Sequence, residues 1–243
     1  MKRISGVDGC RGGWLAFHFD GKNWTENLYN EIVQLYSECD SSLILIDIPI
    51  GLRTNESLER LCDLETRKIL KKRKASIFPV PSRLAIECNE YRSASQKNKK
   101  ATGRGLSQQS FQIIPKIREV DNFIQSPNYN PRKTRIREGH PEVCFWGLNG
   151  CSEMNHNKKT ALGKSERMRV LNGYIKDVNK IFGQTRSRYF KKQVGDDDII
   201  DALVCAVTAI FNGSLSTFPV APENDTKGIT MEIVYYNSNE NRI

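Results

Sequence analysis

The stretch that most constrains the fold is residues 4–19, which read ISGVDGCRGGWLAFHF. Apolar residues on both sides of an acidic residue and a glycine-rich turn predict two antiparallel strands joined as a hairpin. Glycines at positions 6, 9, 12 and 13 indicate that the backbone needs room, or a positive φ, in this stretch. Asp8 is expected at the end of the first strand, either as a functional carboxylate or as a residue that stabilises the turn.

The following segments predict a mixed sheet. Residues 23–28 alternate as a third strand, and residues 30–39 have the apolar spacing of a helix. Residues 41–49, SSLILIDIP, form an apolar run typical of a strand buried on both faces. A right-handed crossover would place this fourth strand parallel to the first. Asp8 and Asp47 are therefore expected at the same end of neighbouring strands, where two carboxylates repel each other unless they share a cation.

Residues 52–130 are predicted to form a helical insertion or cap within a single domain that spans residues 1–243. Prolines, glycines and basic residues interrupt the apolar periodicity of this region. The expected pieces are a helix at 54–74, an extended proline-containing segment at 75–83, a polar loop at 92–106, and short helices at 107–114 and 115–124.

The chain is then predicted to return to the sheet with a strand at 133–138. If the backbone stays extended, Glu138, His140 and Glu142 share one face. Glu142 is then either a further catalytic carboxylate or an ion-pair partner for an arginine. An amphipathic helix at 165–182, a second helix at 196–211 and short strands at 217–220 and 231–236 complete the expected elements.

The helix at 196–211 carries the second strong signal. Asp198 and Asp201 are three residues apart and face the same way. An acidic first turn also complements the helix dipole, which explains Asp198 better than it explains Asp201. Carboxylates that converge without a matching set of histidines favour a hard cation, Mg²⁺ or Mn²⁺. Two such ions can activate a water and stabilise the leaving oxygen of a phosphodiester.

Charge and cysteine content narrow the class of protein. The formal net charge of +9 suits a polyanionic partner such as DNA or RNA, and charge alone is explained as well by a solvated basic surface with no ligand. The seven cysteines form no Cys-x-x-Cys pair, which favours reduced thiols in a cytoplasmic protein. No apolar run approaches the length of a membrane span, so we expect no membrane partner.

Six segments, taken in this order, resemble domain-of-unknown-function family 429, which is described as predicted nucleases of ribonuclease H-like fold. They are GVDGCRGGW at 6–14, IDIPIGL at 46–52, FPVPSR at 78–83, QSF at 109–111 with PKI at 115–117, ExHPE at 138–142, and DDxxDA at 197–202. The resemblance covers nearly the whole chain. It implies an α/β fold in which three antiparallel strands are followed by parallel strands, with helices on the flanks.

The resemblance also implies roles for the acidic residues. Asp8 matches the first-strand metal-binding aspartate of ribonuclease H-like proteins, and Asp47 stands where the RuvC-like resolvase branch usually has a glutamate. Asp198 and Asp201 match the acidic pair of the last helix. We therefore predict a metal-dependent nuclease that uses a two-metal mechanism. Its metal ligands would be Asp8, Asp47, Asp198 and Asp201, with Glu142 as a further catalytic carboxylate.

Three residues are predicted to bind the substrate. Arg11 on the glycine-rich turn and Arg83 after the proline segment are expected to grip phosphates, and His140 to act beside the metals. Two alternatives remain open from the residues alone. The first is an ATPase- or kinase-like protein whose hairpin glycines cradle nucleotide phosphates. The second is a nucleic-acid-binding module without catalysis.

Overall fold

The computed structural model describes residues 2–54 and 59–239. The chain forms two compact units. The first contains residues 1–47, 130–216 and 234–243, and the second contains residues 48–129 and 217–233. Residues 48–129 of the second unit nearly coincide with the insertion predicted at 52–130. The segment 217–233 joins this unit as well.

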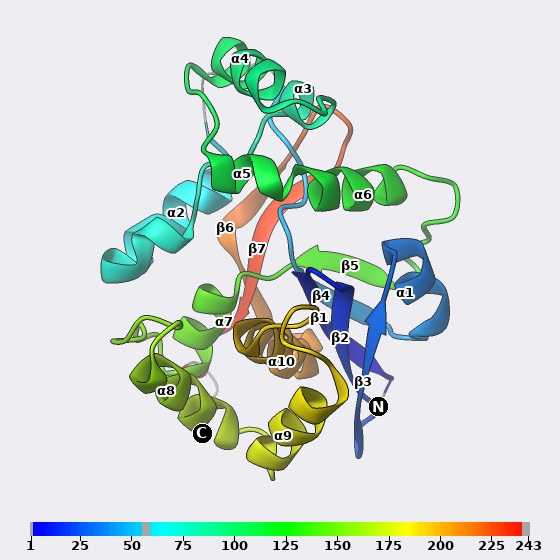
Figure 1. Cartoon of the computed structure of the whole chain (residues 1–243), viewed down its shortest axis with the longest axis vertical. Coiled ribbons are helices and arrows are strands. Elements are labelled where there is room, and N and C mark those ends of the chain that lie inside the picture. The colour runs from blue at the N-terminus through cyan, green and yellow to red at the C-terminus, as the bar shows by residue number, and fades with distance from the viewer. Residues whose placement is uncertain (1, 55–58, 240–243) are drawn as a thin grey trace. The chain divides into compact units, whose positions relative to one another are not determined.

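A five-stranded sheet forms the centre of the first unit (Figure 1). Its strands are β1 (Ile4–Cys10), β2 (Gly13–Phe19), β3 (Trp24–Tyr29), β4 (Leu43–Asp47) and β5 (Arg135–Glu138). They lie in the order β3-β2-β1-β4-β5. The first three strands are antiparallel, whereas β4 pairs in parallel with both β1 and β5. The mixed sheet and its flanking helices confirm the predicted α/β fold, which is consistent with a ribonuclease H-like architecture.

Helices of the first unit flank this sheet. They are α1 (Ile32–Glu38), α7 (Pro141–Leu148), α8 (Ala161–Asn172), α9 (Val178–Arg188) and α10 (Asp196–Ile210), followed by the short η2 (Asn212–Ser214). Helix α10 packs against β1, β2 and β4, and α7, α8 and α9 in turn contact α10. All but a few side chains of α10 are buried, so this helix and the strands beneath it form the centre of the core. Trp14 is fully buried and belongs to the core, not to a surface that could stack on bases.

The second unit is mainly helical. It contains α2 (Leu61–Ile69), η1 (Lys71–Ser76), α3 (Arg83–Ile86), α4 (Tyr91–Thr102), α5 (Gln108–Gln112) and α6 (Ile114–Ile124). A separate two-stranded ribbon, β6 (Leu215–Asn224) and β7 (Thr230–Tyr236), contributes most of its residues to this unit. Residues 55–58 of the helix predicted at 54–74 lie outside the described residues.

The structure corrects three predicted segments. The expected loop at 92–106 is largely helix α4, because Ala94, Asn98 and Ala101 recur at helical spacing and form a buried stripe. The single helix expected at 165–182 is two helices. Asp177, with a φ of 60°, ends the intervening turn in the left-handed conformation. The extended chain expected at 138–142 stops at Pro141, which occupies a first-turn position of α7 and is preorganised for a helix.

Two further observations concern the cysteines and the lengths of the helices. All seven cysteines are free thiols, and six of them are buried. Within residues 2–54 and 59–239, no helix is both long and apolar enough to cross a bilayer.

Candidate active site

Two neighbouring strands deliver Asp8 and Asp47 to one place. Asp8 on β1 and Asp47 at the end of β4 are register partners in the parallel pairing, as predicted. Adjacent strands lie about 4.8 Å apart, so the two carboxylates leave the sheet side by side. Ile4, Gly6 and Asp8 share a face of β1, because side chains alternate along a strand.

Gly6 allows helix α10 to pack directly on this face. A Cβ atom at Gly6 would lie 1.9 Å from the backbone nitrogen of Ala206 and 2.5 Å from the carbonyl oxygen of Ala202. Only glycine tolerates so close an approach of two backbones. This contact fixes α10 over β1 and brings Asp201, which precedes Ala202, toward Asp8.

Two of the three carboxyl groups are buried and the third, Asp47, is partly buried at the end of β4, and all three repel one another. Asp8 and Asp201 are 7% and 2% exposed. Burial raises the pKa of Asp8 well above its usual value, and the charges of Asp47 and Asp201 raise it further. Burial and the charge of Asp201 likewise raise the pKa of Asp47 to about 8. The charges of Asp47 and Asp201 act on Asp8, and the charge of Asp201 acts on Asp47, so α10, β1 and β4 bring these carboxyl groups into one cluster.

A lysine that the sequence did not single out balances this cluster. Lys158 precedes α8, and its Nζ donates a hydrogen bond to Asp201 Oδ2 at 2.5 Å. Asp201 is the main cause of a pKa for Lys158 above its usual value, and Asp47 and Asp8 contribute. One ammonium group therefore stands opposite three carboxyl groups. In the sequence, Lys158 is only one member of a basic run.

Asp198 has a structural task at the start of α10. Its Oδ2 accepts a hydrogen bond of 2.7 Å from the backbone N–H of Gly195, which forms part of a capping box. Burial nevertheless raises the pKa of Asp198, and the charge of Asp201 adds to the increase. Asp198 thus belongs to the electrostatic cluster while one of its oxygens is committed to the helix end.

Glu142 and Glu138 lie near the cluster, and their surroundings differ. Glu142, in the first turn of α7, forms an ion pair with the buried Arg167 of α8, which is the ion-pair alternative weighed for it from the sequence. Its Oε2 is buried and accepts no hydrogen bond from the described residues. Glu138 ends β5, is 4% exposed, and its charge contributes to the raised pKa of Asp47. Carboxyl groups therefore end β4 and β5, and a third lies two residues before the end of the neighbouring parallel strand β1.

The chemistry of the cluster suits a hard divalent cation, but the described side chains do not form a metal site in their present geometry. Its donors are carboxylate oxygens, and Asp201 Oδ1 is buried with no hydrogen-bond partner among the described residues. However, in the part of the chain that the structure describes, no three His, Cys, Asp or Glu side chains are arranged closely enough to hold a metal. A shared ion therefore requires side-chain rotation, including release of Asp201 from Lys158.

Substitution of Asp8 should stabilise the metal-free protein. An acid whose pKa is raised by folding opposes folding at neutral pH, because the unfolded chain releases the proton freely. Asp8→Asn removes this cost, so we expect a gain of about 1–2 kcal/mol in the free energy of unfolding in urea with EDTA. Asp201→Asn also removes the Lys158 ion pair and should give no such gain. An Asp8→Asn protein less stable than wild type would contradict the repulsion described here.

A comparison with known protein families assigns the chain to one of them. Residues 6–224 match the family described as "Protein of unknown function (DUF429)". The chain belongs to DUF429. The match includes Asp8, Asp47, Asp198 and Asp201, so the whole acidic cluster lies in the family region. No curated protein and no solved structure matched this DUF429 chain significantly.

The predicted substrate-binding residues of this DUF429 protein have different surroundings. Arg11 is exposed on the turn between β1 and β2, close in sequence to Asp8. His140 immediately precedes α7 as its N-cap residue. Arg83 belongs to the second unit, is 7% exposed, and forms ion pairs with Asp121 and Asp225. Because both carboxylates already engage its guanidinium group, we leave Arg83 out of the site.

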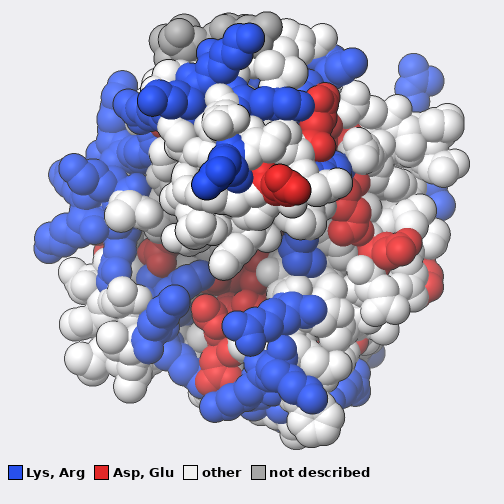
Figure 2. Space-filling view, turned by 45° about the horizontal axis from the view of Figure 1, so that its top comes forward, with Lys and Arg blue, Asp and Glu red and all other residues white. Residues whose placement is uncertain are grey.

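Charge on the surface of the DUF429 chain is dominated by cations. Figure 2 shows a face on which Lys and Arg side chains surround smaller groups of Asp and Glu. At the start of α10, Asp196 contacts both Lys164 and Arg186. Basic side chains thus lie beside the acidic helix end as well as elsewhere on the surface.

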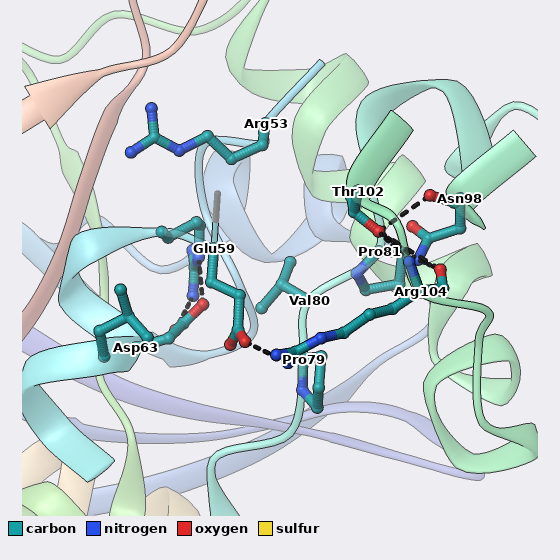
Figure 3. Close-up of a pocket in the computed structure, with 11 residues that line it drawn as sticks. Arg53, Glu59, Asp63, Pro79, Val80, Pro81, Asn98, Thr102 and Arg104 are labelled. Carbon is teal, nitrogen blue, oxygen red and sulfur yellow. Dashed lines mark hydrogen bonds and ion pairs between the residues drawn. The ribbon is translucent and has the colours of Figure 1, made fainter. Parts of the chain in front are cut away.

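The second unit of the DUF429 chain contains a cavity of about 220 Å³ (Figure 3). Leu64 and the Pro79–Pro81 segment supply apolar walls. Arg104 pairs with Glu59, and Arg60 pairs with the carboxylate of Asp63. Since these lining charges compensate one another, we assign the cavity no role in phosphate binding.

Proposed function

We propose that this chain hydrolyses phosphodiester bonds of nucleic acid with the help of Mg²⁺ or Mn²⁺. The observation that carries the proposal is the register pairing of Asp8 with Asp47, close enough to Asp201 for the charges to interact, with Lys158 paired to Asp201. Structural stability alone does not account for this arrangement, because buried like charges oppose folding.

Asp8, Asp47 and Asp201 would hold the metal, and Asp198 would assist from the end of α10. When bound, divalent ions supply Lewis-acid activation of water and neutralise charge on the phosphate. Glu142 would face the cluster from the α7 side, with Arg167 fixing its position. Lys158 balances the carboxylates before metal binding, and after release from Asp201 its ammonium group is free to contact a phosphate oxygen.

The basic surface supports nucleic acid as the substrate. A net charge of +9 favours a polyanion through the release of counterions, and Arg11 places one exposed guanidinium group beside the strand that carries Asp8. Seven free thiols support a reducing compartment, and we place the activity in the cytoplasm.

The nucleotide-phosphate alternative has less support. Gly12 donates its N–H to the carbonyl oxygen of Gln193 at 2.9 Å, and a Cβ at Gly13 would lie 2.0 Å from the carbonyl oxygen of Tyr29. These hairpin glycines thus serve contacts within the protein.

The test is cleavage of labelled single-stranded and duplex DNA and RNA by purified protein. We expect products in Mg²⁺ or Mn²⁺ and none in EDTA. Binding of nucleic acid without any metal-dependent cleavage would instead favour the non-catalytic module.

A further inference from the structure

Phe190, which follows α9, is an exposed aromatic residue. Its side chain is 72% exposed, and no other Phe, Tyr or Trp is exposed among the described residues. Leaving an aromatic ring in water forgoes the free energy that burial would provide. A ring exposed in this way has a face available to stack on a ligand.

Hydrogen bonds hold the backbone around Phe190 in a defined turn. Its carbonyl oxygen accepts the N–H groups of Gln193 and Val194 at 2.9 and 3.0 Å. The Arg186 guanidinium group donates to the carbonyl oxygens of Tyr189 and Val194, on either side of the ring. Val194 is fully buried and anchors the end of the turn. The exposure of Phe190 is therefore built into the turn and is not a consequence of a loose end.

The same turn is attached to the acidic site. The carbonyl oxygen of Gln193 accepts the N–H of Gly12, in the hairpin that carries Asp8. Two residues after Gln193 the chain enters α10, which carries Asp201. Figure 1 shows this segment as the yellow stretch between α9 and α10, which rises beside the strands of the first unit.

One lysine lies against the ring, and other exposed cations lie on the same turn and on the hairpin bonded to it. Lys192 Nζ lies 5.8 Å from the centre of the Phe190 ring, and Lys191 is exposed next to it. Arg11 is exposed on the hairpin to which the turn is bonded. An exposed aromatic face among cations is the chemistry that recognises an unpaired base and its flanking phosphates. Duplex bases are already stacked and offer no free face to such a ring.

We propose that Phe190 stacks on an unpaired base, so that the chain binds single-stranded nucleic acid, with Lys191, Lys192 and Arg11 beside the phosphates. The use of this contact to position a strand for cleavage rests on the proposed function. The binding itself does not, because it needs no metal.

The experiment measures binding of fluorescein-labelled oligo(dT), oligo(U) and a duplex by anisotropy, in EDTA. Phe190→Ala should weaken single-strand binding about 10-fold, and Phe190→Trp should retain it. Leu162→Ala is the matched control, because Leu162 is 65% exposed on α8 of the same unit. That variant should bind like wild type. An oligonucleotide with 2-aminopurine should show fluorescence quenching with wild type and Phe190→Trp, and none with Phe190→Ala.

Equal single-strand binding by wild type and Phe190→Ala would overturn the inference. Tighter binding of the duplex than of either single strand, or no binding of either, would do the same. Metal-independent binding through Phe190 in a protein that never cuts would sustain the inference while refuting the proposed nuclease. Cleavage by Phe190→Ala with an unchanged KM would support the proposed nuclease and refute the role of Phe190.

Discussion

Asp8→Asn is expected to lower metal-dependent cleavage of nucleic acid by at least about 100-fold, because loss of a bound ion removes several kcal/mol of transition-state stabilisation. Asp8 is the carboxyl group that β1 places opposite Asp47, and Asn keeps its shape while removing its charge. The change should leave the fold intact, since it relieves repulsion in the cluster. The rate is measured with labelled oligonucleotides in excess Mn²⁺, after confirming the fold by circular dichroism.

Asp40→Asn is the control for this substitution. Asp40 is exposed in the same unit, and its φ of 45° is a conformation that Asn also adopts readily. The control should cleave at the wild-type rate. Cleavage by Asp8→Asn at that rate would exclude Asp8 from the chemistry and with it the proposed mechanism.

Gly6→Ala should destabilise the protein by about 3 kcal/mol, at the upper end of the range for an overpacked core. The new methyl group would overlap the backbone of α10 at Ala206, and a helix backbone cannot rotate aside as a flexible side chain can. Helix α10 must move away from β1 and carry Asp201 with it. Cleavage should therefore fall even at temperatures at which the variant is folded. The measurements are urea unfolding and the cleavage rate at a temperature well below the transition.

Gly183→Ala is the matched control for Gly6→Ala. Gly183 lies within α9, and a Cβ atom there would meet no atom within 4 Å. Alanine favours helix over glycine by up to about 1 kcal/mol, so this variant should be as stable as wild type or slightly more stable. A Gly6→Ala protein that matches Gly183→Ala in stability would show that the close contact of α10 with β1 is unimportant.

Much of the sheet could be predicted because its signals are local. The apolar run that ends at Asp47 indicates a buried strand, and the handedness of crossovers places it beside β1. The pairing of Asp8 with Asp47 then follows from the chain order, and the structure has it. The acidic start of α10 was equally visible, since apolar residues at helical spacing follow it directly.

The partners of the acidic residues could not be predicted in the same way. Lys158 and Asp201 are 43 residues apart, and the loop before α8 that brings them together has no periodic pattern. Arg167 looked like one charge in a basic run, yet its side chain is 1% exposed and paired with Glu142. Gly6 was visible as a glycine, but only the position of α10 explains it.

The predicted helix boundaries differ from the structure where polar residues hide the buried face of a helix or a turn between two helices. The basic surface of α4 predicts a loop, although Ala94, Asn98 and Ala101 mark the buried face of a helix. The break between α8 and α9 depends on Asp177 in a left-handed conformation, which aspartate adopts without any marked change in composition.

Titration of the wild-type protein and Asp8→Asn with Mn²⁺ tests the metal site most directly. Isothermal calorimetry and the signal of free Mn²⁺ in electron paramagnetic resonance both report binding without requiring a substrate. We expect saturable binding by the wild type and strongly weakened binding by Asp8→Asn. Identical Mn²⁺ binding by the two proteins, or none by the wild type, would contradict a metal site built on Asp8, Asp47 and Asp201.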